Sequence, residues 1–303
     1  KKLFSVVILT IFCVLGAKAQ IADGYYHIRN AVTKRYISIN DTDPGNYRAT
    51  QAGDVNMAGI RTYKNYDTVA VSPSCGIFIK NLGNGYDLII QGSSLYNMAN
   101  QKLAINITSN GNGTYKIHGT VQGITKYLSD GSPSGSDSWM MNNRVDTQDW
   151  IPIPINTTDQ FIAVRPDVKT ADGQYFGTIR AGFSFRLVSE GMAAFYVSNA
   201  GGTGFTMNQI EGDIVPAGIP VIIRCNSANI EDNKIEPVIG GYTFDNPNWL
   251  EGVYCSISVA KHRNTTPYDQ ITMRLLGLSD KGELAFVKDV PAERLYKEQY
   301  LMA

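Results

Sequence analysis

The sequence is poor in cysteine, histidine and charged residues, and each shortage argues against a class of function. Its 303 residues include 4 Cys and 3 His, with no C-x-x-C pair, so a zinc site is not expected. Charged residues make up only 18% of the chain, and no stretch has the pattern of a charged amphipathic helix. We therefore expect neither a metal-dependent protein nor a helical one, and no cofactor.

Long apolar runs are absent after the first twenty residues. Lys1 and Lys2 precede an apolar run from Leu3 to Gly16, and small residues follow at Ala17 and Ala19. This order of charge, apolar core and cleavage site is that of a secretory signal peptide. The run is too short to span a bilayer comfortably. We expect residues 1–19 to be removed and the mature chain to be secreted or on the cell surface, without a membrane span.

Removal of residues 1–19 changes the charge balance and the cysteine count. It takes away 3 of the 27 basic residues and none of the 27 acidic ones, which leaves a net charge of −3. A nucleic-acid partner calls for a basic face, so none is expected. Three cysteines remain, an odd number that excludes a dense disulfide framework. Cys225 and Cys255 share strand parity with apolar neighbours, so they form an inter-sheet disulfide or remain buried thiols.

What the sequence does contain favours strands and tight turns. It has 29 Gly and 17 Tyr, and its length is one at which a single core usually splits into two. A turn dipeptide, Asp-Gly or Asn-Gly, followed by a strand-forming segment with Tyr and Ile, occurs three times, at residues 23–28, 84–89 and 112–117. The composition predicts an all-β protein of two domains, and the repeats predict pseudo-threefold symmetry in the first.

The first domain resembles a known family. Residues 22–156 open with Gly-Tyr-Tyr-x-Ile and close with Gln148-Asp149-Trp150, and in this they resemble the ricin-type β-trefoils of secreted proteins of Bacteroidota. In that family Gln-x-Trp is the signature. The resemblance implies that Trp150 packs in the core while Gln148 supports a sugar site. In the first repeat Phe78 and Gly76 stand at the Trp and Gln places, which leaves a family-like sugar site only in the third repeat.

The glycan-binding candidates of the third repeat are Asp130, Trp139, Asn143 and Gln148. Protein sites for glycans pair an aromatic face, which covers the apolar side of the sugar ring, with carboxylate and amide groups for the hydroxyls. Ricin-like repeats place their sugar-binding acid where Asp130 stands. The alternative is that Asp130-Gly131 is only a turn.

The second domain, residues 161–303, follows an extended segment that contains Pro152 and Pro154. Alternating residues separated by Gly-rich turns predict a β-sandwich. The expected strands are 174–187, 193–198, 205–211, 220–225, 253–259, 271–276 and 283–288. This region resembles an accessory domain of Bacteroidota surface proteins and enzymes, and the chain is expected to stop inside its last strand.

Catalytic and calcium motifs are incomplete. The nearest match to a nucleophile elbow, residues 131–135, has Pro in the nucleophile position. Strand alternation places His27 and His118 away from the apolar face, in solvent or shallow grooves. Asp41 and Asp43 stand at alternate positions, as the ligands of calcium loops do, but no bidentate Glu follows at the expected spacing. Such residues are also common in any loop. We therefore expect no enzyme and no metal.

The sequence thus predicts a non-catalytic, secreted or cell-surface binding protein whose trefoil engages a glycan or a surface polysaccharide. Two alternatives stay open. One is an adhesion or accessory scaffold that binds protein, or nothing, because β-trefoils host several unrelated functions. The other is a secreted hydrolase with an unrecognised site. Further domains of the same longer chain are also expected as neighbours.

Overall fold

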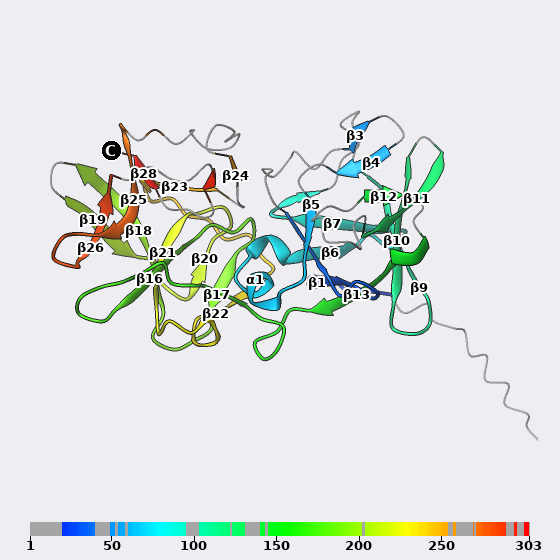
Figure 1. Ribbon diagram of the computed structural model, residues 1–303, viewed down its shortest axis with the longest axis horizontal. Helices are drawn as coiled ribbons and strands as arrows, with labels where there is room; N and C mark the ends of the chain where they lie inside the picture. The colour runs from blue at the N-terminus through cyan, green and yellow to red at the C-terminus, as the bar shows by residue number, and fades with distance from the viewer. Residues whose placement is uncertain are drawn as a thin grey trace, which may run out of the picture.

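The computed structural model describes residues 20–39, 49–51, 54–57, 60–94, 103–121, 123–130, 140–142, 145–201, 204–253, 257–258, 269, 271–288, 294–295 and 300–302. It is nearly all β, with 47% strand and 7% helix, which confirms the predicted class. Strands β1–β13 form one lobe and strands β14–β28 a second, with helix α1 near their junction (Figure 1). The described helices include none that is long and apolar enough to cross a membrane. The predicted signal peptide, the calcium candidates Asp41 and Asp43, and Cys255 lie outside the described residues.

Six antiparallel strands of the N-terminal lobe close into a ring, in which each strand pairs with two neighbours. In ring order these are β1 (Gly24–Asn30), β6 (Ile77–Asn81), β7 (Tyr86–Ile90), β9 (Ile105–Ser109), β10 (Tyr115–Val121) and β13 (Asp149–Pro154), and β13 returns to β1. Closure leaves no sheet edge in the ring, and the apolar side chains of alternate residues fill its interior.

Shorter strands extend the ring at three places. These are β2 (Tyr36–Ile39) with β5 (Ile60–Tyr63) beside β1, β8 (Ser93–Ser94) beside β7, and β11 (Ile124–Ser129) with β12 (Met140–Asn142) beside β10. A further pair, β3 (Ala49–Gln51) and β4 (Asp54–Met57), joins β12. The extensions therefore follow β1, β7 and β10, which are the strands opened by the three repeated turn segments.

The three repeated strands take alternate positions in the ring and pair with their neighbours in equivalent register. Each places a tyrosine opposite a buried or core-facing apolar residue: Tyr26 faces Ile77, Tyr86 faces Ile105, and Tyr115 faces Trp150. Five of these side chains are buried members of one core cluster, and Tyr115 packs against that cluster. The repeat predicted from the turn dipeptides is thus present in the pairing of the strands.

This register corrects one expectation about the first repeat. The residue equivalent to Trp150 is Ile77, not Phe78, because Ile77 faces Tyr26 as Trp150 faces Tyr115. Side chains alternate between the two faces of a strand, so a slip of one residue moves the whole set to the opposite face. Phe78 accordingly points away from the barrel core and packs on Tyr25, with ring centroids 5.0 Å apart.

Trp150 is fully buried, as predicted, and is among the largest buried side chains of the protein. Its indole Nε1 donates a hydrogen bond to the Leu128 carbonyl oxygen at 3.0 Å, so the one polar atom of the side chain is satisfied. The two prolines of β13, Pro152 and Pro154, pair only with β1, whereas the β10 pairing ends at Trp150. Both prolines are thus paired on one side only, where no ladder to β10 would need the N–H group that proline lacks, although β13 as a whole has two neighbours.

The C-terminal lobe contains three larger sheets and one pair of short strands. A five-stranded sheet has the order β15 (Val168–Lys169), β16 (Tyr175–Ile179), β21 (Val221–Cys225), β18 (Ala193–Gly201) and β19 (Gly204–Gln209). A four-stranded sheet has the order β14 (Ile162–Ala163), β22 (Lys234–Pro237), β17 (Phe185–Leu187) and β20 (Ile214–Val215). A third has the order β23 (Leu250–Glu251), β28 (Tyr300–Met302), β25 (Met273–Leu278) and β26 (Leu284–Val287), and β24 (Ile257–Ser258) pairs with β27 (Arg294–Leu295).

The five-stranded sheet is covered on both faces. Val221, Ile223 and Cys225 face a core shared with the sheet of β14, β22, β17 and β20. Ile222, between them, faces a second core that includes Leu250 and residues of β25 and β26. Burial on both faces accounts for consecutive apolar residues in β21. The predicted two-layer sandwich is therefore not confirmed, although Cys225 faces the core as expected.

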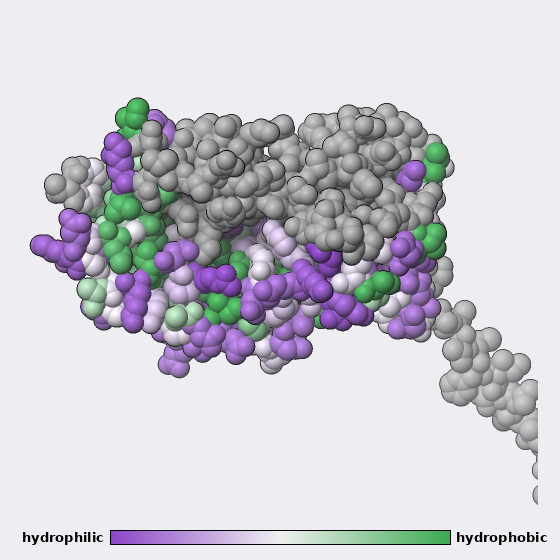
Figure 2. Space-filling model, viewed as in Figure 1, coloured by the Kyte–Doolittle hydropathy of each residue, from purple (hydrophilic) through white to green (hydrophobic). Residues whose placement is uncertain are grey.

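The lobes meet through direct contacts. The ring of Tyr25 lies 5.1 Å from that of Phe183, and the backbone amide of Gly182 donates a hydrogen bond to Gln91 Oε1. Gly182 lies so close to Gln91 that an added Cβ would sit 2.1 Å from the Gln91 carbonyl carbon. On the face shown in Figure 2, the coloured residues along the boundary between the lobes are mainly hydrophilic.

Candidate functional site

Asp130, the predicted sugar-binding acid, lies in the interior. Its side chain is 0% exposed. Thr33 Oγ1 donates a hydrogen bond to Asp130 Oδ2 at 2.6 Å, and Arg35 Nε lies 3.8 Å from the same oxygen. A second hydroxyl, Thr62 Oγ1, is 3.5 Å from Oδ1. The carboxylate is thus held by groups of the first repeat, and this arrangement does not present it to a sugar.

Gln148 lies in the same buried polar region, at 5% exposure. Its neighbour Thr147 accepts hydrogen bonds at its carbonyl oxygen from Asn30 Nδ2 (2.8 Å) and from the Asp130 amide (3.2 Å). The other two candidates, Trp139 and Asn143, lie outside the described residues. Asp130 and Gln148 are thus both buried, and Thr147, which precedes Gln148, is hydrogen-bonded to the Asp130 backbone.

His27 is buried, contrary to the expectation that it faces solvent. Alternation does direct it away from the barrel core, but helix α1 (Tyr66–Ala70) and the 3-10 turn Pro73–Cys75 cover this side of β1. Its Nδ1 lies 3.1 Å from the Cys75 carbonyl oxygen, and its ring packs edge-on against Tyr36 and Tyr66. Burial away from water lowers the pKa of His27 to about 4. The side chain is therefore neutral at physiological pH.

His118 is partly buried and is occupied by local contacts. Its Nε2 lies 3.2 Å from Thr108 Oγ1, and its ring packs against Tyr127 with centroids 5.1 Å apart. Burial lowers its pKa as well. A stacked imidazole with a hydroxyl partner is fully explained by packing within the sheet.

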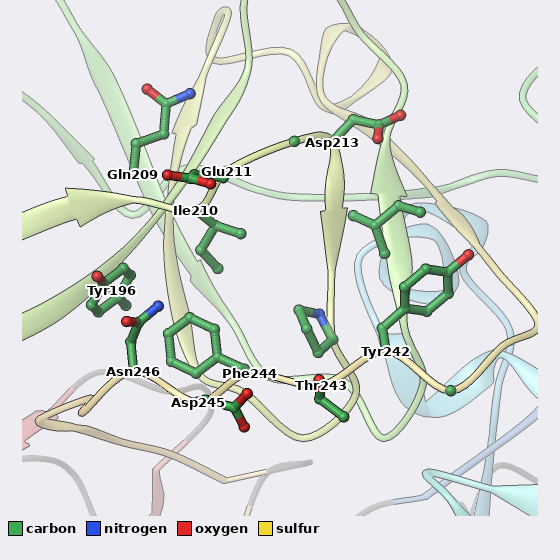
Figure 3. A pocket seen from close by; sticks show the side chains of 14 residues that line it. Tyr196, Gln209, Ile210, Glu211, Asp213, Tyr242, Thr243, Phe244, Asp245 and Asn246 are labelled. Atoms are coloured by element: carbon green, nitrogen blue, oxygen red, sulfur yellow. The ribbon is translucent and has the colours of Figure 1, made fainter.

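The C-terminal lobe contains an open cleft of about 760 Å³ that the sequence did not predict (Figure 3). One wall is the end of β19 with the turn that leads into β20, residues 209–214. The other is the segment 241–246, which has no regular secondary structure. Tyr196, from β18, lies between them. The cleft is therefore built from a rigid sheet on one side and a loop on the other.

Aromatic rings form part of the cleft wall. Tyr196 and Phe244 pack edge to face, with centroids 5.0 Å apart and an interplanar angle of 79°. Tyr242 is 42% exposed, so part of its ring is open to solvent. Figure 3 shows Tyr242 and Phe244 on the loop side of the cleft, with Tyr196 of β18 beside Phe244 and Ile210 opposite it. The cleft thus offers flat apolar surfaces beside water.

Polar groups surround these rings. The lining includes three carboxylates, Glu211, Asp213 and Asp245, which are all exposed. It also includes the amide side chains of Gln209 and Asn246. Carboxylate oxygens accept hydrogen bonds, while amides both donate and accept. The cleft can therefore bind a ligand with several hydroxyl groups and an apolar face.

One lining carboxylate has a partner. Arg186 Nε lies 2.9 Å from Asp213 Oδ2, and Arg186 Nη1 lies 3.2 Å from Glu236 Oε2. Glu211 and Asp245 have neither a hydrogen bond nor an ion pair from the side chain with any described residue. Across the part of the chain that the structure describes, no group of three or more His, Cys, Asp or Glu side chains is placed to hold a metal ion. The carboxylates of the cleft are thus spread out.

The sequence did contain a signal for this cleft. The run Gly-Tyr-Thr-Phe-Asp-Asn at residues 241–246 combines two aromatic residues with a carboxylate and an amide in a segment without strand alternation. Exposed loops that carry aromatic and polar residues together are common binding elements. Its partner wall is thirty residues earlier in the chain, and only the fold brings the two together.

Comparisons with known proteins add no assignment: no family model, no curated protein and no solved structure matches this chain.

Proposed function

We propose that this protein is an exported, non-catalytic carbohydrate-binding protein whose glycan site is the cleft of the C-terminal lobe. The observation that carries the proposal is the combination, in one open cleft, of an aromatic pair, an exposed tyrosine, carboxylates and amides. Sugar rings have an apolar face that packs on aromatic rings and hydroxyls that hydrogen-bond to carboxylates and amides. A preformed cleft of this kind is the usual form of a small-ligand site.

The N-terminal lobe enters this proposal as a β-trefoil of ricin type. The closed ring of six strands, its three extensions and the equivalent register of Tyr26, Tyr86 and Tyr115 support that fold. Trefoils host lectins as well as unrelated functions, so the fold alone does not locate a ligand. The burial of Asp130 and Gln148 favours the cleft over the third repeat as the principal site.

The test is a glycan panel probed with the mature chain, residues 20–303. We expect binding to at least one polysaccharide, and Tyr242→Ala should weaken it about fivefold, because an exposed ring that packs on a sugar contributes roughly 1 kcal/mol. Trp249→Ala is the control, since Trp249 is exposed to a similar degree, 38%, but does not line the cleft. Thermal unfolding of both variants checks that they are folded.

Equal binding by wild type and Tyr242→Ala would locate the glycan site elsewhere, with the third repeat as the next place to search. A panel without any bound glycan would remove the proposal. The protein would then be better described as an adhesion or accessory scaffold.

A further inference from the structure

We infer that the cleft selects glycans that carry free amines, such as polymers of glucosamine, over neutral and acidic glycans. This inference rests on the proposed function and names its ligand class. It is drawn from the distribution of charge in the cleft, which differs from that of the molecule as a whole. Of the net charge of −3 of the mature chain, residues 20–156 contribute +1 (11 basic and 10 acidic residues) and residues 157–303 contribute −4 (13 basic and 17 acidic residues). Three of those acidic residues line the cleft, and no basic residue does.

The cleft lining contains no cation. Its charged residues are Glu211, Asp213 and Asp245, and none of its fourteen residues is Lys, Arg or His. Arg186, which pairs with Asp213 from outside this lining, is shared with Glu236 and so is already engaged with two carboxylates. A ligand carboxylate would meet three like charges and no unengaged partner in this lining. Acidic glycans, such as polyuronates, are therefore disfavoured.

The two remaining carboxylates are available to a ligand. Glu211 and Asp245 are exposed and make no hydrogen bond or ion pair with a described residue. In the view of Figure 3 they lie on opposite sides of Phe244. An ammonium group donates three hydrogen bonds and binds a carboxylate with charge assistance, which a neutral hydroxyl does not.

The spacing of the carboxylates distinguishes this ligand from a metal ion. A divalent cation draws several oxygen ligands around one point, and the described residues of the cleft form no such group. Carboxylates placed on either side of an aromatic ring suit a chain in which amines recur on successive sugars while the rings pack on Phe244 and Tyr242. The aromatic wall also favours a glycan over a basic peptide, because a peptide would pair with the carboxylates but would not need the rings.

The experiment compares oligosaccharides of equal length and linkage by calorimetry, in slightly acidic buffer of low salt, where the sugar amine is protonated. The ligands are a glucosamine oligomer, its fully N-acetylated form and a glucose oligomer, with a polyuronate and polylysine beside them. We expect the glucosamine oligomer to bind about fivefold or more tightly than the N-acetylated and glucose forms, because each exposed charge pair contributes modestly. Added salt should reduce that preference.

The variant Glu211→Gln/Asp245→Asn should abolish the preference, so that the glucosamine, N-acetylated and glucose oligomers bind it with similar affinity. Glu283→Gln is the matched control, because Glu283 is an exposed carboxylate of the same lobe that lies outside this cleft. Equal affinity for the amine, N-acetylated and glucose forms would overturn this inference and leave the proposed function standing. Tighter binding of the polyuronate would also overturn it. So would polylysine binding that depends on Glu211 and Asp245 but not on Tyr242. Failure of every glycan to bind would remove both proposals.

Discussion

At the scale of single residues, Asp130 shows how a polar side chain acts inside the barrel wall. Its carboxylate accepts a hydrogen bond from the Thr33 hydroxyl, and the Arg35 guanidinium lies beside the same oxygen. Removal of one partner of a buried charged pair leaves the other uncompensated. We expect Asp130→Ala to lower the free energy of unfolding by about 3 kcal/mol, measured by urea denaturation, with no change in glycan affinity of the folded fraction.

The control for Asp130 is Asp149→Asn. Asp149 is partly exposed and pairs with Lys116 at 3.1 Å, so its loss should cost less than about 1 kcal/mol. If Asp130→Ala kept full stability but lost glycan binding, the carboxylate would be a sugar ligand and the sequence-based assignment would be right.

The buried imidazole of His27 links stability to pH. Its pKa is about 4 in the folded protein against 6.5 when unperturbed, so the unfolded chain binds the proton more readily. Stability from this group is complete above pH 6.5, falls as pH drops from 6.5 to 4, and changes no further below that. The total loss is on the order of 3 kcal/mol.

The free energy of unfolding, measured by urea denaturation at several pH values across this range, should therefore depend less on pH in His27→Gln than in wild type, whatever the absolute stability of the variant. His118→Gln should keep most of the pH dependence of the unfolding free energy, because His118 is much less buried than His27. If the unfolding free energy of His27→Gln depended on pH as that of wild type does, other groups would be the cause of the acid sensitivity.

At the scale of elements, the strand register of the ring can be tested by comparing substitutions at two adjacent residues of β6. Ile77 points into the barrel core and is 0% exposed, whereas Phe78 is half-buried and packs on Tyr25. Ile77→Ala should cost about 3 kcal/mol through the cavity it leaves. We expect Phe78→Ala to cost less despite the larger side chain, as measured by thermal or urea unfolding. The reverse order would show that Phe78, not Ile77, is the equivalent of Trp150.

The same strands show what the sequence could and could not predict. Turn dipeptides followed by Tyr identified β1, β7 and β10 correctly, because the chemistry of those turns is local. The place of Trp150 in the core was also predictable from its motif. Face assignment in β6 was wrong by one residue, because alternating patterns are ambiguous where Ile77, Phe78 and Ile79 are all apolar.

Long-range features were beyond sequence reasoning. The burial of His27 depends on helix α1, which packs over β1 from forty residues further along the chain. The third sheet that covers Ile222 and the cleft between residues 209–214 and 241–246 likewise arise only when distant segments meet. The burial of Asp130, one of the four candidates that sequence reasoning placed in the third repeat, could not be predicted either, because no local pattern encodes solvent exposure.

At the scale of the whole molecule, the two lobes are expected to unfold as coupled units. Each has its own core, as two independent domains would. However, Tyr25 and Ile155 of the N-terminal part pack against the C-terminal core. Separate expression of residues 22–156 and 161–303 would expose these apolar contacts to water.

The junction can be tested at Gly182. An added methyl group there would lie 2.1 Å from the Gln91 carbonyl carbon, and backbone atoms cannot yield as a flexible side chain does. Gly182→Ala must therefore displace the chains on either side and weaken the coupling. We expect calorimetry to show a lower first transition, by several degrees, and a wider separation between the unfolding of the two lobes. Gly201→Ala is the control, because nothing lies within 4 Å of its added Cβ. If Gly182→Ala unfolded as wild type does, this close approach would not contribute to holding the lobes together, and their independent folding would be the better description.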